Sequence, residues 1–257
     1  MTNAVHLSHV EFDIAWDLLR LGERPYPISV PTFGVTADER AVLRDRALHT
    51  MAERGLHDGR DLHPRLEDLL VLMVRNRFTV DGQLWAGRYL RVLAAGGGEH
   101  GALAVQSDDE VRIERVRATN VVGALVALLP AAEPGPGGAV SLPRTLFDEA
   151  VSAYASGGHL ALETALRRGG ITGRDLRGLS TLLESGRRAG GQLAANSMDR
   201  VGRRTRTPVL NFFDTEAGRY LLYTEPRRDG QQWLTCAPGG SDRVAHRLNE
   251  LVTRLDV

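Results

Sequence analysis

The sequence predicts an α+β fold in which a central antiparallel β-sheet is flanked by two α-helical bundles. Two capping boxes, each followed by an apolar stripe, predict helices near the N-terminus, and a later stretch with period-two hydrophobicity predicts strands. After a Pro/Gly-rich break near the middle of the chain, helices and strands recur in the same order. We therefore expect a quasi-two-fold duplicated unit made of two related halves.

The composition is that of an ordinary globular protein. Of 257 residues, 42% are hydrophobic and 25% are charged, and the 32 basic side chains balance the 32 acidic ones, so no overall field draws in nucleic acid. All 32 basic residues are Arg, which is typical of a GC-rich bacterial genome. The longest apolar run, 121–129, is far shorter than the roughly 20 residues of a membrane span, and the first residues do not resemble a signal peptide. We expect a cytoplasmic protein without nucleic-acid partners or stable membrane insertion.

Three helices are expected in the first half. They begin at two capping boxes and at a proline suited to a first helical turn: Ser8 with Glu11, Thr36 with Glu39, and Pro64. A short strand precedes Ser8, and Gly55 is placed to end the second helix. The segment 22–35 holds three prolines, which predict an extended, ordered loop.

Four strands and a short helix complete the first half. The strands are expected at 78–81, 87–94, 102–106 and 110–116. Turns at Gly96-Gly97-Gly98 and Ser107-Asp108-Asp109 separate them, and an apolar helix over 120–129 follows.

The run 133–138 is rich in proline and glycine and divides the chain into halves of approximately 1–132 and 139–257. The second half is expected to contain, in order, a strand at 140–142, a helix over 143–155 with further helix to about 186, strands at 190–197, 207–213, 219–224 and 232–236, and a last helix over 242–255.

Two sequence matches relate the halves. The eleven residues from Val5 match those from Val140 at five positions, and Gly87-Arg88-Tyr89-Leu90 recurs as Gly218-Arg219-Tyr220-Leu221. The offsets, 140 − 5 = 135 and 218 − 87 = 131, are nearly equal. Since each half alone has an open sheet edge, we expect the halves to join into one sheet, meeting at the Gly-Arg-Tyr-Leu copies.

The sequence predicts no catalytic residue, metal site or cofactor. His6, His9, Glu11 and Asp13 lack the helical spacing of a metalloprotease, and Ser156 and Ser185 lack a nucleophile-elbow motif. The glycines 96–98 join two strands instead of opening a helix, so they do not form a phosphate loop. The single cysteine, Cys236, is expected to be a buried small residue on a strand.

Two groups of residues are candidates for partner binding. One is a set of arginines that flank a predicted strand and crowd a loop near Gly202, where they are either a solvated hairpin tip or a contact for an acidic partner segment: Arg187, Arg188, Arg203, Arg204 and Arg206, with Arg200 beside them. The other consists of large side chains on strands, which form either core or an exposed binding face: Phe212, Tyr220 and Trp233.

Several segments together resemble one protein family. They are Leu21-Gly22-Glu23-Arg24-Pro25-Tyr26-Pro27, Asp38-Glu39-Arg40, Arg54-Gly55-Leu56, Gly191-Gln192-Leu193, the run from Phe213 to Leu221, and Ala237-Pro238. In number and order these resemble the EspG family of type VII (ESX) secretion-associated chaperones, over nearly the whole chain. The resemblance implies a cytosolic actinobacterial chaperone that grips the tip of the PPE partner in PE-PPE heterodimers, using the sheet, nearby loops and the C-terminal bundle. It carries over no catalytic residue and no cofactor.

The sequence thus favours a non-enzymatic chaperone for helical secretion substrates, acting as a monomer or weak homodimer. Two alternatives are a small-molecule hydrolase or transferase with a site between the halves, and an adaptor subunit of the secretion machine. A deep pocket with convergent ionisable groups favours the enzyme, and a broad, shallow, exposed face favours the chaperone.

Overall fold

The computed structural model describes residues 4–199, 201 and 203–255. The helices in this range are α1 (His9–Leu18), α2 (Ala37–Glu53), α3 (Pro64–Val74), α4 (Val121–Val126), α5 (Arg144–Arg168), α6 (Gly173–Glu184) and α7 (Ser241–Thr253), with a 3-10 turn η1 (Ala118–Asn120). The strands are β1 (Ala4–Ser8), β2 (Phe78–Trp85), β3 (Tyr89–Gly97), β4 (His100–Gln106), β5 (Glu110–Arg117), β6 (Val140–Pro143), β7 (Arg187–Met198), β8 (Arg204–Arg206), β9 (Leu210–Thr215), β10 (Gly218–Pro226) and β11 (Gln232–Pro238).

The predicted helix starts are confirmed because each depends on local chemistry. The Ser8 hydroxyl accepts from the Glu11 backbone N–H, and the Glu11 carboxylate accepts from the Ser8 N–H at 2.8 Å. Thr36 and Glu39 make the same reciprocal pair at α2, and α3 begins at its proline. Gly55 follows the end of α2 with φ of 67°, a left-handed conformation that favours glycine.

All the described strands belong to one antiparallel sheet. Its order is β1-β5-β4-β3-β2-β7-β9-β10-β11-β6, and β8 pairs with the end of β7. The two halves meet where β2 pairs with β7 over eight residue pairs, from Phe78 with Ser197 to Trp85 with Gly190. The prediction that they meet at the Gly-Arg-Tyr-Leu copies is therefore wrong, because the first copy runs into the start of β3 and the second begins β10, and neither strand lies at the junction.

The strand order is the same in both halves when it is followed outward from the β2–β7 seam. The strands of the Val5 and Val140 match, β1 and β6, lie at equivalent outer edges. The Gly-Arg-Tyr-Leu copies do not lie on equivalent strands. Counting outward from β2 and from β7 as first strands, β3 is the second strand of its half and β10 is the third strand of the other. Their environments also differ: Arg88 is exposed, whereas Arg219 is fully buried.

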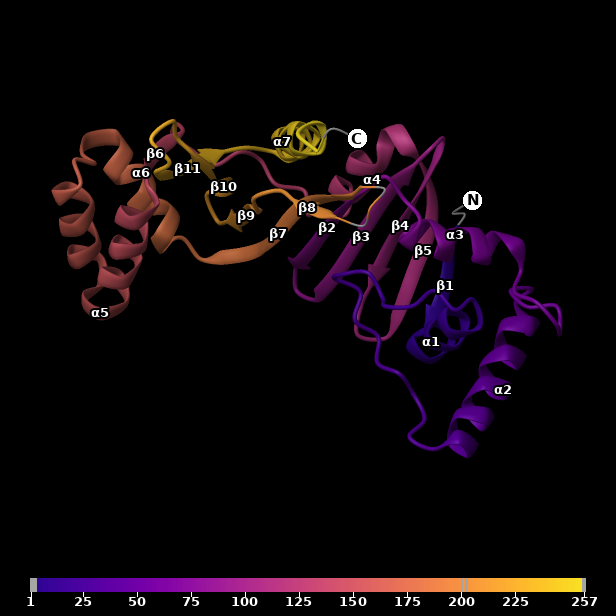
Figure 1. Cartoon of the computed structure of the whole chain (residues 1–257). Helices are drawn as coiled ribbons and strands as arrows, with labels where there is room; N and C mark the ends of the chain where they lie inside the picture. The colour runs from indigo at the N-terminus through magenta and orange to yellow at the C-terminus, as the bar shows by residue number, and fades with distance from the viewer. Residues whose placement is uncertain (1–3, 200, 202, 256–257) are drawn as a thin grey trace.

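Three apolar cores place the helices in two layers. α4 and α7 cover one side of the central strands, whereas α1 and α3 cover the other side of the first half, and α5 and α6 cover that side of the second half. In Figure 1, α4 and α7 lie above the central strands, α5 and α6 lie at the left and α1 and α2 at the lower right. Among the described residues, no helix lies beneath β2 and β7 in this view, so one side of the sheet's centre is not covered by helices.

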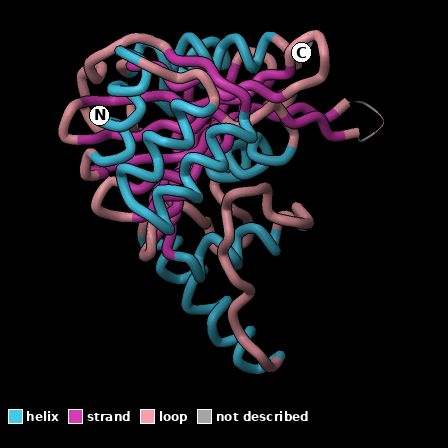
Figure 2. Tube along the Cα trace, turned by 90° about the vertical axis from the view of Figure 1, so that its left-hand side faces the viewer, coloured by secondary structure: helices cyan, strands magenta, loops and turns pink. Residues whose placement is uncertain are grey.

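Some element boundaries differ from the sequence prediction. β2 continues four residues beyond Asp81 because it is paired on both sides, and Gly82 provides space for Leu193: a Cβ on Gly82 would lie 2.7 Å from that side chain. α4 ends sooner than predicted, and α5 is interrupted by a non-helical residue, Gly158. Figure 2 shows the β7–β8 hairpin projecting from the body of the molecule. In the part of the chain that is described, no helix combines the length and apolarity needed to cross a bilayer.

Candidate functional site

The uncovered side of β2, β7 and β9 is the principal candidate site. On β2, Val80 and Leu84 pack in the core beneath α4 and α7, and the neighbours of Leu84, Gln83 and Trp85, therefore lie on the opposite side. Trp85 is 48% exposed, which is unusual for so large an apolar side chain. We call this surface the open central face; its residues are Gln83, Trp85, Tyr89, Arg187, Gln192, Asn211 and Phe213.

A shallow hollow of about 310 Å³ lies at the centre of this face. Gly190 pairs with Trp85 on one side and with Phe213 on the other, and its missing side chain leaves the space between the two rings. The Arg187 guanidinium lies over the Phe213 ring, 4.4 Å from its centroid. Aromatic rings, side-chain amides and one cation are therefore available to a partner.

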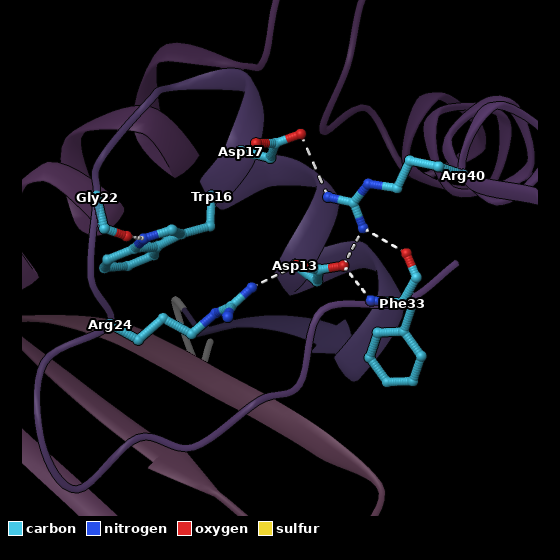
Figure 3. Close-up of polar contacts among 7 residues, drawn as sticks. All are labelled: Asp13, Trp16, Asp17, Gly22, Arg24, Phe33 and Arg40. Atoms are coloured by element: carbon cyan, nitrogen blue, oxygen red, sulfur yellow. Dashed lines mark hydrogen bonds and ion pairs between the residues drawn. The ribbon is translucent and has the colours of Figure 1, made fainter. Parts of the chain in front are cut away.

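The loop 22–35, which we call the strap, is fixed to α1 by a buried carboxylate. Asp13 is 1% exposed at its side chain, and Figure 3 shows Arg24 and Arg40 converging on it. The backbone N–H of Phe33 donates to the same carboxylate at 3.0 Å. Arg24 and Arg40 belong to two of the segments that carry the family resemblance, and their common partner gives those segments a structural role.

The linker between the halves is fixed by a second buried ion pair, at the end of the β9–β10 hairpin. Arg219 is 0% exposed and donates to both oxygens of Asp214 at 2.6 and 2.7 Å. It also donates to the Pro130 carbonyl, and its backbone pairs with Glu133 and Gly135. The run from 133 to 138 therefore lies along β10 as an ordered segment.

The predicted arginines do not form one cluster. Arg187 and Arg188 begin β7, whereas the other candidates belong to the hairpin at its far end: Arg203, Arg204 and Arg206. A twelve-residue strand spans roughly 35 Å, so the two groups serve opposite ends of the sheet. Arg200 lies outside the described residues.

Two of these arginines have acidic partners. Arg188 lies 3.5 Å from Glu216, with both side chains exposed, and Arg206 pairs with the buried Asp81. Two hairpin residues are exposed and make no ion pair with any residue that the structure describes: Arg203 and Arg204.

Two of the three large strand residues are core and not surface. Phe212 is 1% exposed beneath α4 and α7, and Tyr220 is 3% exposed against α5 and α6. Trp233 is half-buried on β11, with the Arg227 guanidinium over its ring. Alternation directs Phe212 to the side covered by α4 and α7. Tyr220 pairs with Phe213 and lies on the same side as the open central face, but α5 and α6 cover it.

Sequence reasoning missed Gln83, Trp85 and Tyr89. A usable signal was present, since Trp85 and Tyr89 flank a Gly-containing turn and pair directly across β2 and β3. Gln192 and Phe213 lay within segments of the family resemblance, but their position on an uncovered surface depends on helix placement.

The side chains considered as a metal cluster have separate partners. His6 contacts Glu110, and His9 contacts the carbonyl of Ser107. Across the described residues, no group of three or more His, Cys, Asp or Glu side chains could hold a metal ion. Cys236 is buried, as predicted, and burial raises the pKa of its thiol to about 12.

The comparisons with known proteins agree with the fold. Residues 8–250 match the model of the EspG family. A similar solved structure is that of the Mycobacterium tuberculosis type VII secretion system chaperone EspG5 in complex with a PE25-PPE41 dimer. It has a TM-score of 0.78 and 17% sequence identity, and the match covers 97% of this chain and 95% of that one. No curated protein matches this sequence.

Proposed function

The chain belongs to the EspG family, and from this we propose that it is a cytoplasmic type VII (ESX) secretion chaperone. Its clients are PE-PPE-like helical heterodimers, which it binds at the PPE tip, keeps soluble and delivers for export. EspG5, whose fold this chain shares, was solved with such a dimer. The action consists of covering client surface and requires no chemical step.

The observation that carries this proposal is the open central face. It is broad and shallow, it crosses the seam of the two halves, and it lies between helices that belong to different halves. Exposed Trp, Tyr and Arg are the residue types that dominate binding energy at protein interfaces. The structure gives little support to the enzymatic alternative. Asp81, a carboxylate on the central strand β2, is held in an ion pair with Arg206 and is not free to act as an acid or base.

The first test removes the Trp85 ring, which lines the hollow of the open central face. The chaperone is co-expressed with each PE-PPE-like pair encoded in the same genome, and complexes are isolated by size-exclusion chromatography. Trp85→Ala should weaken the complex by tenfold or more, on the order of a hot-spot loss. Trp233→Ala is the matched control, because this tryptophan lies on β11 away from the face. Equal affinities for the two variants, or no co-elution with any pair, would contradict the proposal.

The exposed hairpin arginines supply a second contact, directed at an acidic client segment. Arg203→Ala combined with Arg204→Ala should slow client association at low salt and have little effect at high salt, because exposed charges mainly steer encounter. Stopped-flow association at two ionic strengths measures this difference. Unchanged rates under both conditions would mean that the hairpin is only solvated.

The adaptor alternative predicts instead a complex that stays intact when the secretion machine assembles.

A further inference from the structure

A buried carboxylate lies beside the open central face without being part of its surface. Asp81 stands two residues before Gln83 on β2, so both side chains lie on the same side of the sheet. Yet Asp81 is only 3% exposed. Its oxygens accept from both terminal nitrogens of Arg206, one at 3.0 Å, and from the Asn196 amide at 2.6 Å. This ion pair fixes β8 against the central strands.

The strap reaches the same cluster through Tyr26. The Arg206 guanidinium lies over the Tyr26 ring, 5.3 Å from its centroid. The Tyr26 hydroxyl accepts a hydrogen bond from Gln83 Nε2 at 2.8 Å. Asp81, Arg206, Tyr26 and Gln83 therefore form a closed circuit of contacts that begins and ends on β2. The strap itself is held by Asp13 on both sides of Tyr26, through the Arg24 side chain and the Phe33 backbone N–H.

Gln83 belongs to both this circuit and the hollow of the open central face. A primary amide has two N–H donors and one acceptor oxygen, so a bond from one N–H to Tyr26 fixes the orientation of the remaining polar atoms. An amide held in one orientation loses less freedom when it binds than a mobile one.

We propose that Tyr26 is a positioning residue for client recognition, which orients the Gln83 amide to pair with a backbone group at the client tip. The inference rests on the proposed chaperone function and adds a contribution from the N-terminal strap to a surface otherwise made of strands. Tyr26 is itself 56% exposed and Gln83 is half-buried, so water can replace the hydrogen bond of the hydroxyl and its loss costs little folding stability.

Tyr26→Phe tests this directly, because it removes the hydroxyl and keeps the ring under Arg206. We expect it to weaken client affinity about three- to tenfold, because binding must then order a mobile Gln83 side chain, with an unchanged thermal midpoint. Gln83→Ala should weaken binding at least as much, and Tyr26→Phe should add nothing in the Gln83→Ala background. The matched control is Tyr223→Phe, whose ring also lies under an arginine, Arg247, but on the side covered by α7.

The probe is the PE-PPE-like pair that co-elutes with the wild-type chain, and affinity is measured by titration calorimetry. Wild-type affinity, or tighter binding, for Tyr26→Phe overturns the inference and leaves the chaperone function standing. Additive losses in the double variant also overturn it, because Tyr26 would then contact the client independently of Gln83. If the wild-type chain binds no pair, the chaperone function fails and this inference fails with it. In the free protein, Tyr26→Phe should also shift the side-chain amide signal of Gln83 in NMR spectra.

Discussion

At the scale of single residues, the same side chain has different roles in the two halves. Asp13 and Asp148 are aligned by the sequence repeat. Asp13 is buried and accepts from two arginines and a backbone N–H, whereas Asp148 is exposed and pairs with Arg144 one helical turn away. Breaking the buried ion pairs of Asp13 should cost much stability, because it leaves the arginines without a counter-charge in a site that water hardly reaches. Breaking the exposed pair of Asp148 should cost little, because water solvates both charges.

Asp13→Asn should therefore destabilise the protein by roughly 2–4 kcal/mol, because it leaves Arg24 and Arg40 without their shared carboxylate. Asp148→Asn, the aligned control, should cost about 0.5 kcal/mol or less. Urea unfolding at neutral pH measures both values. Similar costs for the two variants would show that the strap is not held by its buried ion pairs.

At the scale of elements, helix α7 is fixed to the sheet by a charge cluster. Glu225 on β10 accepts from Arg247 and Arg254 of the C-terminal segment, and the Arg247 guanidinium also lies over the Tyr223 ring. Burial alone would raise the pKa of Glu225, but hydrogen bonds from the two arginines outweigh it and hold the pKa below its ordinary value of 4.5.

A lowered folded-state pKa gives stability that is present above the ordinary pKa and is lost as pH falls through the folded value. Glu225→Gln should therefore be less stable than the wild type at pH 7, and the difference should shrink as the pH falls below about 4.5. Thermal melts across this range test the prediction, with the exposed Glu149→Gln as control. A difference that stays constant with pH would mean that the charge of Glu225 is not responsible.

At the scale of the whole molecule, the two halves share a core as well as a sheet. The cluster beneath α4 and α7 combines Val80 and Leu84 from the first half with Leu193, Phe212 and Leu248 from the second. Side chains of both halves pack together in this cluster. Each half alone would expose a long central strand, β2 or β7, as an unpaired edge. We propose that the halves 1–132 and 139–257 are duplicated units that fold only together.

A chain split within the run 133–138 tests this proposal. The halves should aggregate when expressed singly, because of the exposed seam, and should form a soluble one-to-one complex when co-expressed. Sedimentation and circular dichroism distinguish these outcomes. A soluble, folded monomer of either half would show that the seam is an interface between independent domains.

The sequence by itself determined the features that depend on neighbouring residues. The caps at Ser8 and Thr36, the proline start of α3 and the turn at 107–109 are local, because a side chain and a backbone group a few residues apart satisfy each other. The sequence also predicted one antiparallel sheet with two helical groups, and a family that the match over 8–250 confirms.

Only the tertiary structure decided where the halves meet and which side of the sheet stays uncovered. Pairing of β2 with β7 joins residues more than a hundred positions apart, and a four-residue match was too short to fix the register between the halves. Helix placement then determined that Phe212 is buried while its neighbour Phe213 lies on the open central face. Adjacent strand residues point to opposite sides, so the role of each depends on which side the helices cover.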